Sequence, residues 1–133
     1  MGGSIAAGMI AVQNSVSPLQ SAIIMLCDQP YVSSATLRSL CDEQRRTRSA
    51  VVASRYCESD DTLGVPALFT SARFAALAQL CGALGAKQLI ASESSSTFID
   101  CPEAIPDVDT SADTLATHSR PQGKTSQYQS LAD

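Results

Sequence analysis

The sequence has no tryptophan, a single histidine, no long apolar run and no basic block beyond residues 45–48. A membrane-spanning helix needs about 18 or more consecutive apolar residues, and the N-terminus lacks the basic region of a signal peptide. The net charge is −4, whereas a nucleic-acid-binding domain normally presents a basic face. These absences predict a cytoplasmic protein that binds neither membranes nor nucleic acid.

Histidine and cysteine are poorly placed for catalysis. His118 follows the last predicted elements, so a Ser-His-Asp or Cys-His arrangement has no plausible base. The five cysteines are odd in number, and no two have the C-x-x-C spacing of a zinc site or a redox pair. We therefore expect most of them to be small buried side chains in a reducing compartment.

The 133 residues, 44% of them hydrophobic, suffice for one domain with its own core. Apolar periodicity, prolines and capping residues predict alternating helices and strands: helices over 4–16, from Ser33 or Ser34, after Ser71 and over 83–91; strands over 21–27, 50–56, 64–69 and near 96–101. The proline at position 66 suggests an edge or irregular strand. This alternation predicts an α/β fold with a mostly parallel sheet over residues 1–116, followed by a flexible polar tail, 117–133.

Asp28 lies in the segment "AIIMLCDQPYV" at 22–32, directly after its apolar run. Because the run is apolar throughout, we expect a strand buried on both faces. In open α/β sheets ligands bind beyond the carboxyl ends of the strands. A carboxylate there could bind a hard cation such as Mg²⁺, or it could cap the backbone amides that follow. Its position alone does not decide between the two.

A second acidic segment, "DVDTSAD", covers residues 107–113. In an extended chain Asp107 and Asp109 point to the same face and could complete a metal site that bridges phosphates. The local alternative is a helix start, capped by Thr110 or Ser111 with Asp113 in the first turn. Taken alone, the segment favours the local alternative.

The opening "MGGSIAAG" is glycine-rich but matches neither a P-loop, which needs Lys and Ser or Thr after the last glycine, nor G-x-S-x-G, since position 6 is alanine. It predicts a turn that opens a helix, whose free amides could face an anion.

Together these segments resemble the MobA-like nucleotidyltransferases, in particular the molybdenum cofactor cytidylyltransferase type. The resemblance covers residues 2 to about 115 and rests on six stretches in the family's order: "GGSIAAG" (2–8), "LCDQPYV" (26–32), "VVASRY" (51–56), "GVPALF" (64–69), "LGAKQLI" (84–90) and "DVDTSADT" (107–114). It implies a Rossmann-like three-layer fold, and transfer of a nucleotidyl group from CTP or GTP to a phosphorylated acceptor such as molybdopterin, with release of pyrophosphate.

The resemblance also implies roles for individual residues. Asp28 would be catalytic and would bind Mg²⁺ together with Asp109 and Asp107. The nucleotide would lie along Gly3, Ser4 and Gly8. The acceptor would lie against Gly64, Val65 and Pro66.

The family's opening strand and glycine-rich loop, roughly "LAAGxSxRMGxxK", have no counterpart in this sequence. We therefore expect a partial domain that has negligible activity alone, either because the gene start is misplaced or because the chain is a non-catalytic remnant. Loss of the first strand would leave residues 21–27 at a sheet edge that could pair with another copy. A small α/β binding module, with Asp28 acting only as a cap, is the alternative outside the family.

Overall fold

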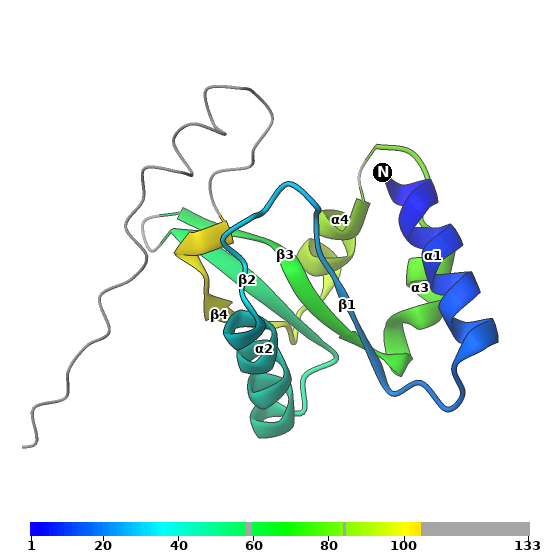
Figure 1. Cartoon of the computed structure of the whole chain (residues 1–133), viewed down its shortest axis with the longest axis horizontal. Coiled ribbons are helices and arrows are strands. Elements are labelled where there is room, and N and C mark those ends of the chain that lie inside the picture. Colours follow the sequence, from blue (N-terminus) through cyan, green and yellow to red (C-terminus); the bar gives the residue numbers. More distant parts are fainter. Residues whose placement is uncertain (58–59, 84, 105–133) are drawn as a thin grey trace, which may run out of the picture.

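The computed structural model describes residues 1–57, 60–83 and 85–104. These form three layers, with a four-stranded sheet between helices (Figure 1). One face of the sheet packs against α1, α3 and α4 around the fully buried Phe69 and Leu77, and the other packs against α2 around Leu40. In this part of the chain, no helix has the length and apolar character of a membrane span.

The elements follow the predicted order, with shifted ends. They are α1 (Gly2–Ser15), β1 (Ser21–Ile24), α2 (Ser34–Thr47), β2 (Val51–Cys57), β3 (Asp60–Thr70), η1 (Ser71–Arg73), α3 (Phe74–Ala78), α4 (Gly85–Ser92), β4 (Thr97–Asp100) and η2 (Pro102–Ala104). Ser33 caps α2 by accepting a hydrogen bond from the Thr36 amide, as its position predicts. The acidic segment over 107–113, with its possible helix start, and the tail predicted over 117–133 lie outside the described residues.

The sheet has the order β1-β3-β2-β4. β3 is antiparallel to both of its neighbours, and β2 is parallel to β4. Three strands therefore run in one direction, as an α/β fold predicts, and β3 runs in reverse. The reversal arises because β2 and β3 follow each other in the chain and pair as antiparallel neighbours. β3 also begins at Asp60, earlier than the strand predicted over 64–69.

β3 is a central strand although it contains Pro66. Its pairing with β2 shifts register between Val52, opposite Leu68, and Ser54, opposite Gly64. One residue of β2 thus faces three residues of β3, a bulge that takes Pro66 out of the regular ladder. Of the two positions that the proline suggested, edge or irregular, the structure shows the irregular one.

β1 is shorter and more exposed than its apolar sequence suggests. It ends at Ile24, all four residues are half-buried, and it pairs only with β3 among the described strands. The prediction of a strand buried on both faces is therefore wrong. An apolar run looks the same in sequence whether or not a neighbouring strand covers it.

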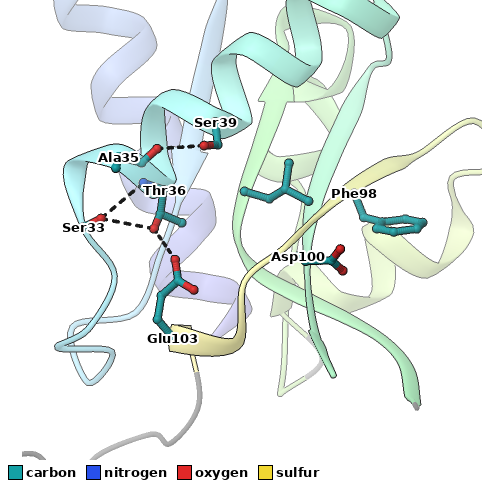
Figure 2. Close-up of a pocket in the computed structure, with 8 residues that line it drawn as sticks. Ser33, Ala35, Thr36, Ser39, Phe98, Asp100 and Glu103 are labelled. Atoms are coloured by element: carbon teal, nitrogen blue, oxygen red, sulfur yellow. Dashed lines mark hydrogen bonds between the residues drawn. The ribbon is translucent and has the colours of Figure 1, made fainter. Parts of the chain in front are cut away.

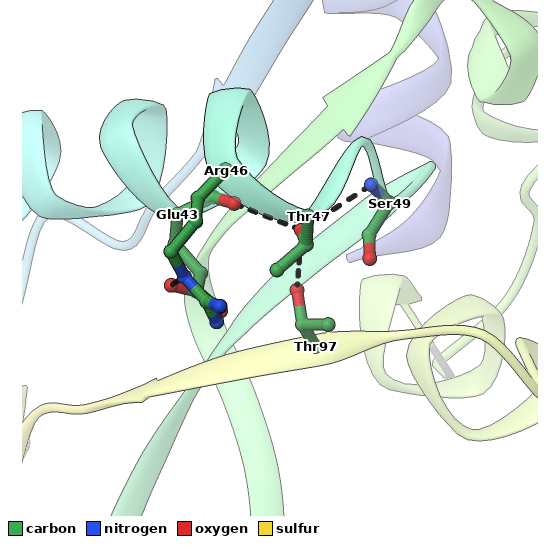
Figure 3. A network of polar contacts seen from close by, with 5 residues as sticks. All are labelled: Glu43, Arg46, Thr47, Ser49 and Thr97. Atoms are coloured by element: carbon green, nitrogen blue, oxygen red, sulfur yellow. Dashed lines mark hydrogen bonds and ion pairs between the residues drawn. The ribbon is translucent and has the colours of Figure 1, made fainter.

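The C-terminal end of α2 contacts β4 through a chain of hydroxyl groups (Figure 3). Thr47 Oγ1 lies 2.8 Å from the Glu43 carbonyl oxygen, to which it donates, and 3.4 Å from the Thr97 hydroxyl. It also accepts a hydrogen bond from the Ser49 amide. These contacts join the helix to the edge strand and fix the start of β2.

Only one of the four cysteines whose side chains are described is buried. Cys101 has no exposed surface, Cys41 is half-buried, and Cys27 and Cys81 are exposed. The prediction of mostly buried cysteines is therefore wrong, because Cys27 lies in the loop after β1 and Cys81 follows the end of the short α3.

Candidate active site

Asp28 lies in the loop between β1 and α2, at the sheet edge where β1, β2 and β4 end. The residue is half-buried, and its Oδ1 atom is inaccessible and has no hydrogen-bond partner. A cap would give this oxygen an amide donor. A buried polar atom without a partner is costly, and a bound cation is one way to satisfy a carboxylate oxygen. The Asp28 carboxylate therefore suits a hard metal ion as a ligand.

Gln29, the next residue, has a role that its sequence position did not reveal. It is only 4% exposed. Its Nε2 group donates to the Val65 carbonyl at 3.0 Å and to the Ala104 carbonyl at 3.2 Å, and its Oε1 accepts from the Leu26 amide at 3.4 Å. One side chain thus joins the Asp28 loop, the β3 bulge and the end of η2. We call these three contacts the Gln29 bridge.

The predicted acceptor residues Gly64, Val65 and Pro66 are buried in the bulge of β3. The bulge leaves carbonyl groups outside the ladder, and side chains supply their donors. The Val65 carbonyl accepts the Tyr56 hydroxyl at 2.5 Å as well as Gln29, and the Pro66 carbonyl accepts the Ser54 hydroxyl at 2.6 Å. Three donors therefore hold the bulge in place.

Two adjoining pockets lie between α1, β1 and this bulge. An edge groove of about 530 Å³ runs between α1 and β1, with Ser4 and Gly8 in its wall and Leu26 and Cys27 at one end. An inner pocket of about 250 Å³ is lined by Tyr56, Val65 and Lys87, among others. The two share Met1, Ile5, Ile24 and Leu26. Of the predicted nucleotide and acceptor residues, Ser4 and Gly8 line the groove and Val65 lines the inner pocket. The predicted site residues that line neither cavity, among those described, are Gly3, Gly64, Pro66 and Asp28.

The helix predicted over 4–16 begins two residues earlier, so the turn expected at the first glycines is helix. α1 begins at Gly2, so Gly3, Ser4 and Gly8 all lie within it, and Gly3 is exposed. The Gly2 amide donates to the Gly82 carbonyl at 3.0 Å, and the Ser4 amide donates to the Met1 carbonyl. The expectation that these two amides are free for an anion is therefore wrong.

A third pocket, of about 450 Å³, lies between the start of α2 and β4 (Figure 2). Thr36 donates to Glu103 across it at 2.6 Å. On β4, Asp100 pairs with Arg55, whose guanidinium lies 4.3 Å from the centroid of the Phe98 ring. None of the predicted site residues that the structure describes lines this pocket. Its polar side chains largely bond one another, and they hold η2 against α2.

Asp107 and Asp109 lie outside the described residues. Within residues 1–57, 60–83 and 85–104, no three acidic, histidine or cysteine side chains come together as a metal site. Cys101, beside Glu103, is no nucleophile at neutral pH, because burial, with a smaller effect of Glu103, raises the pKa of its thiol to about 11. Among the described residues, Asp28 is the one predicted metal ligand.

Three solved structures are similar to this chain. Rv0371c from Mycobacterium tuberculosis H37Rv is 30% identical with a TM-score of 0.67, over 84% of this chain and 58% of that one. Its complex with manganese is 29% identical, with a TM-score of 0.64 over 81% and 56% of the two chains. A homolog from mycobacterium sp. strain JC1 is 25% identical, with a TM-score of 0.65 over 82% and 54%.

This chain thus spans slightly more than half the length of these relatives. No curated protein gives a comparable match. The likeness confirms the predicted nucleotidyltransferase-like α/β fold. Residues 1–97, about three quarters of the sequence, match the MobA-like NTP transferase domain. With this match, the chain belongs to the MobA-like NTP transferase domain family.

Proposed function

We propose that this chain forms part of a Mg²⁺-dependent nucleotidyltransferase site. The site would transfer a nucleotidyl group from CTP or GTP to a phosphorylated acceptor such as molybdopterin, a step of molybdenum cofactor biosynthesis. Membership of the family supports a nucleoside triphosphate substrate. The observation that carries the proposal is the buried Asp28 Oδ1 atom without a hydrogen-bond partner, at the edge where three strands end.

Asp28, Asp109 and Asp107 would hold the metal ion. The Gln29 bridge holds the Ala104 carbonyl beside the Asp28 loop. Asp107 is three positions after Ala104 in the chain, and Asp109 is five positions after it. A fully extended chain therefore lets them lie at most about 11 Å and about 18 Å from Ala104, respectively. Chain length therefore allows both acids to meet Asp28. When bound, the metal would neutralise negative charge on the phosphates of the nucleotide.

Donor and acceptor would occupy the two adjoining cavities. The nucleotide would lie along the edge groove at Ser4 and Gly8, near Gly3, and the acceptor in the inner pocket against Val65, beside Gly64 and Pro66. An acceptor phosphate oxygen would attack the α-phosphorus in line with the leaving group. The bond to the bridging oxygen then breaks, and pyrophosphate leaves with that electron pair. Lys87, in the wall of the inner pocket, supplies positive charge for the acceptor phosphate.

Metal binding tests this proposal directly. We expect Asp28→Asn to weaken Mn²⁺ binding to the full 133-residue chain at least tenfold, about 1.4 kcal/mol, measured in the presence of CTP or GTP. The substitution removes the charge but keeps the shape. Asp42→Asn is the control, because Asp42 is an exposed partner of Arg45 on α2. Binding is measured because we expect this chain alone to have negligible activity.

Equal Mn²⁺ affinity in wild type and Asp28→Asn would contradict the proposal. Metal-independent binding of CTP would favour a non-catalytic remnant that retains a nucleotide site. A chain that binds neither Mn²⁺ nor CTP would favour the small α/β binding module.

The free edge of β1 supports a second copy of the chain as a further partner. Its backbone groups on that side have no strand among the described residues, and Met25 beside it is 44% exposed. Open edges of this kind pair with other chains unless a charge blocks them. We expect concentration-dependent dimers in analytical ultracentrifugation, and a shift to monomer in Met25→Lys. A wild-type protein that stays monomeric throughout the concentration series would contradict this expectation.

A further inference from the structure

Gln29 is one of four buried polar residues in the described part of the chain, with Thr36, Ser49 and Ser54. Burial of an amide is costly unless its donors and acceptor are matched. Both the Nε2 and Oε1 atoms of Gln29 have partners. The two carbonyl partners are 36 and 75 residues away in sequence. These contacts require precise placement of the amide group relative to both distant carbonyls.

Each contact of the Gln29 bridge fixes a different piece of the proposed site. The Leu26 contact closes the turn that carries Asp28. The Val65 contact holds the bulge that borders the inner pocket. The Ala104 contact holds the end of η2, from which the chain continues to Asp107 and Asp109. A shorter or apolar side chain at position 29 would release Val65 and Ala104 from the loop together.

We propose that Gln29 is a positioning residue for Asp28, the described ligand of the proposed metal site: it holds the loop that carries Asp28 against the β3 bulge and against the end of η2. This inference rests on the proposed function, since it assigns Gln29 a task at the same site. Hydrogen-bond partners outside the ligand set typically change metal affinity 10- to 100-fold when they are removed. Gln29 acts on the ligands through the backbone, and does not itself touch the metal.

The test compares Gln29→Met with Ser54→Ala in the full chain. Gln29→Met keeps the side-chain length and removes all three contacts. Ser54→Ala removes a buried donor to the same bulge, at Pro66, and leaves the loop and Ala104 in place. Thermal unfolding measures the stability of each variant, and Mn²⁺ affinity is measured by electron paramagnetic resonance at a temperature where each is folded. If Gln29→Met does not fold, Gln29→Asn, which is too short to span both carbonyls, replaces it.

We expect Mn²⁺ affinity to fall at least tenfold in the Gln29 variant and to change less than twofold in Ser54→Ala, whatever their melting temperatures. If both variants weaken Mn²⁺ binding equally, or if neither does while Asp28→Asn abolishes it, Gln29 is only a structural amide and the inference is overturned, with the proposed metal site intact. If wild type does not bind Mn²⁺, or binds it independently of Asp28, the proposed function and the inference are both overturned.

Discussion

Phe69→Ala is expected to lower the free energy of unfolding by about 3–5 kcal/mol, the usual cost of removing a fully buried aromatic ring. Phe69 has no exposed surface and lies in β3, opposite Ala22 of β1 and Val51 of β2. The lost ring leaves a cavity between the sheet and the α1, α3 and α4 layer. Single domains are stable by only about 5–15 kcal/mol, so the variant should be close to unfolding. Urea denaturation measures the change.

Phe98→Ala provides a matched control for this prediction. Phe98 lies on the edge strand β4, 43% exposed, with its ring against the Arg55 guanidinium. Loss of an exposed cation–π contact costs about 0.5–1 kcal/mol. Equal losses of stability in the two variants would mean that the core is not centred on β3.

Gly64→Ala is expected to destabilise the protein by about 1–3 kcal/mol through overpacking. A Cβ atom at position 64 would overlap the Tyr56 hydroxyl oxygen and would lie 2.6 Å from the ring carbon Cζ. The tyrosine ring must therefore move, and its hydrogen bond to the Val65 carbonyl is lost with it. The glycine is required here for close approach of a side chain, since every larger residue meets the ring.

A double-mutant cycle identifies the cause of that loss. Once Tyr56→Ala has removed the ring, Gly64→Ala should cost less than about 0.5 kcal/mol, because nothing then meets the new methyl group. Unfolding free energies of the four proteins give the coupling. A cost that stays the same in both backgrounds would mean that the backbone at position 64, and not Tyr56, excludes the methyl group.

Local sequence signals predicted the helices and the class of fold. Ser33 caps α2, Gly82 separates α3 from α4, and the apolar spacing of Ile5 and Met9 places α1 on the core. These features depend on residues a few positions apart, so the sequence contains the whole signal. The resemblance to a known family added the order of the segments, and the match over residues 1–97 confirms that family.

Long-range contacts explain what the sequence did not predict. Pro66 left an edge strand and an irregular strand open. β3 is a central, irregular strand, and Gln29, Tyr56 and Ser54 supply donors to its bulge. The Gln29 side chain joins the Asp28 loop to the Val65 and Ala104 carbonyls, although its place in the sequence suggested only the end of a strand. Its partners are too far along the chain for any spacing rule to find. Within the described residues, Asp28 is the one predicted metal ligand that can be placed.

The shared direction of β1, β2 and β4 has a consequence for engineering the protein. β1, β2 and β4 all end at the edge that carries Asp28, Gln29 and η2. The opposite edge holds the turns over 16–20, 48–50 and 93–96, and none of these residues lines either cavity assigned to substrates. Insertions or fluorescent tags placed after Ser94 should therefore leave ligand binding unchanged.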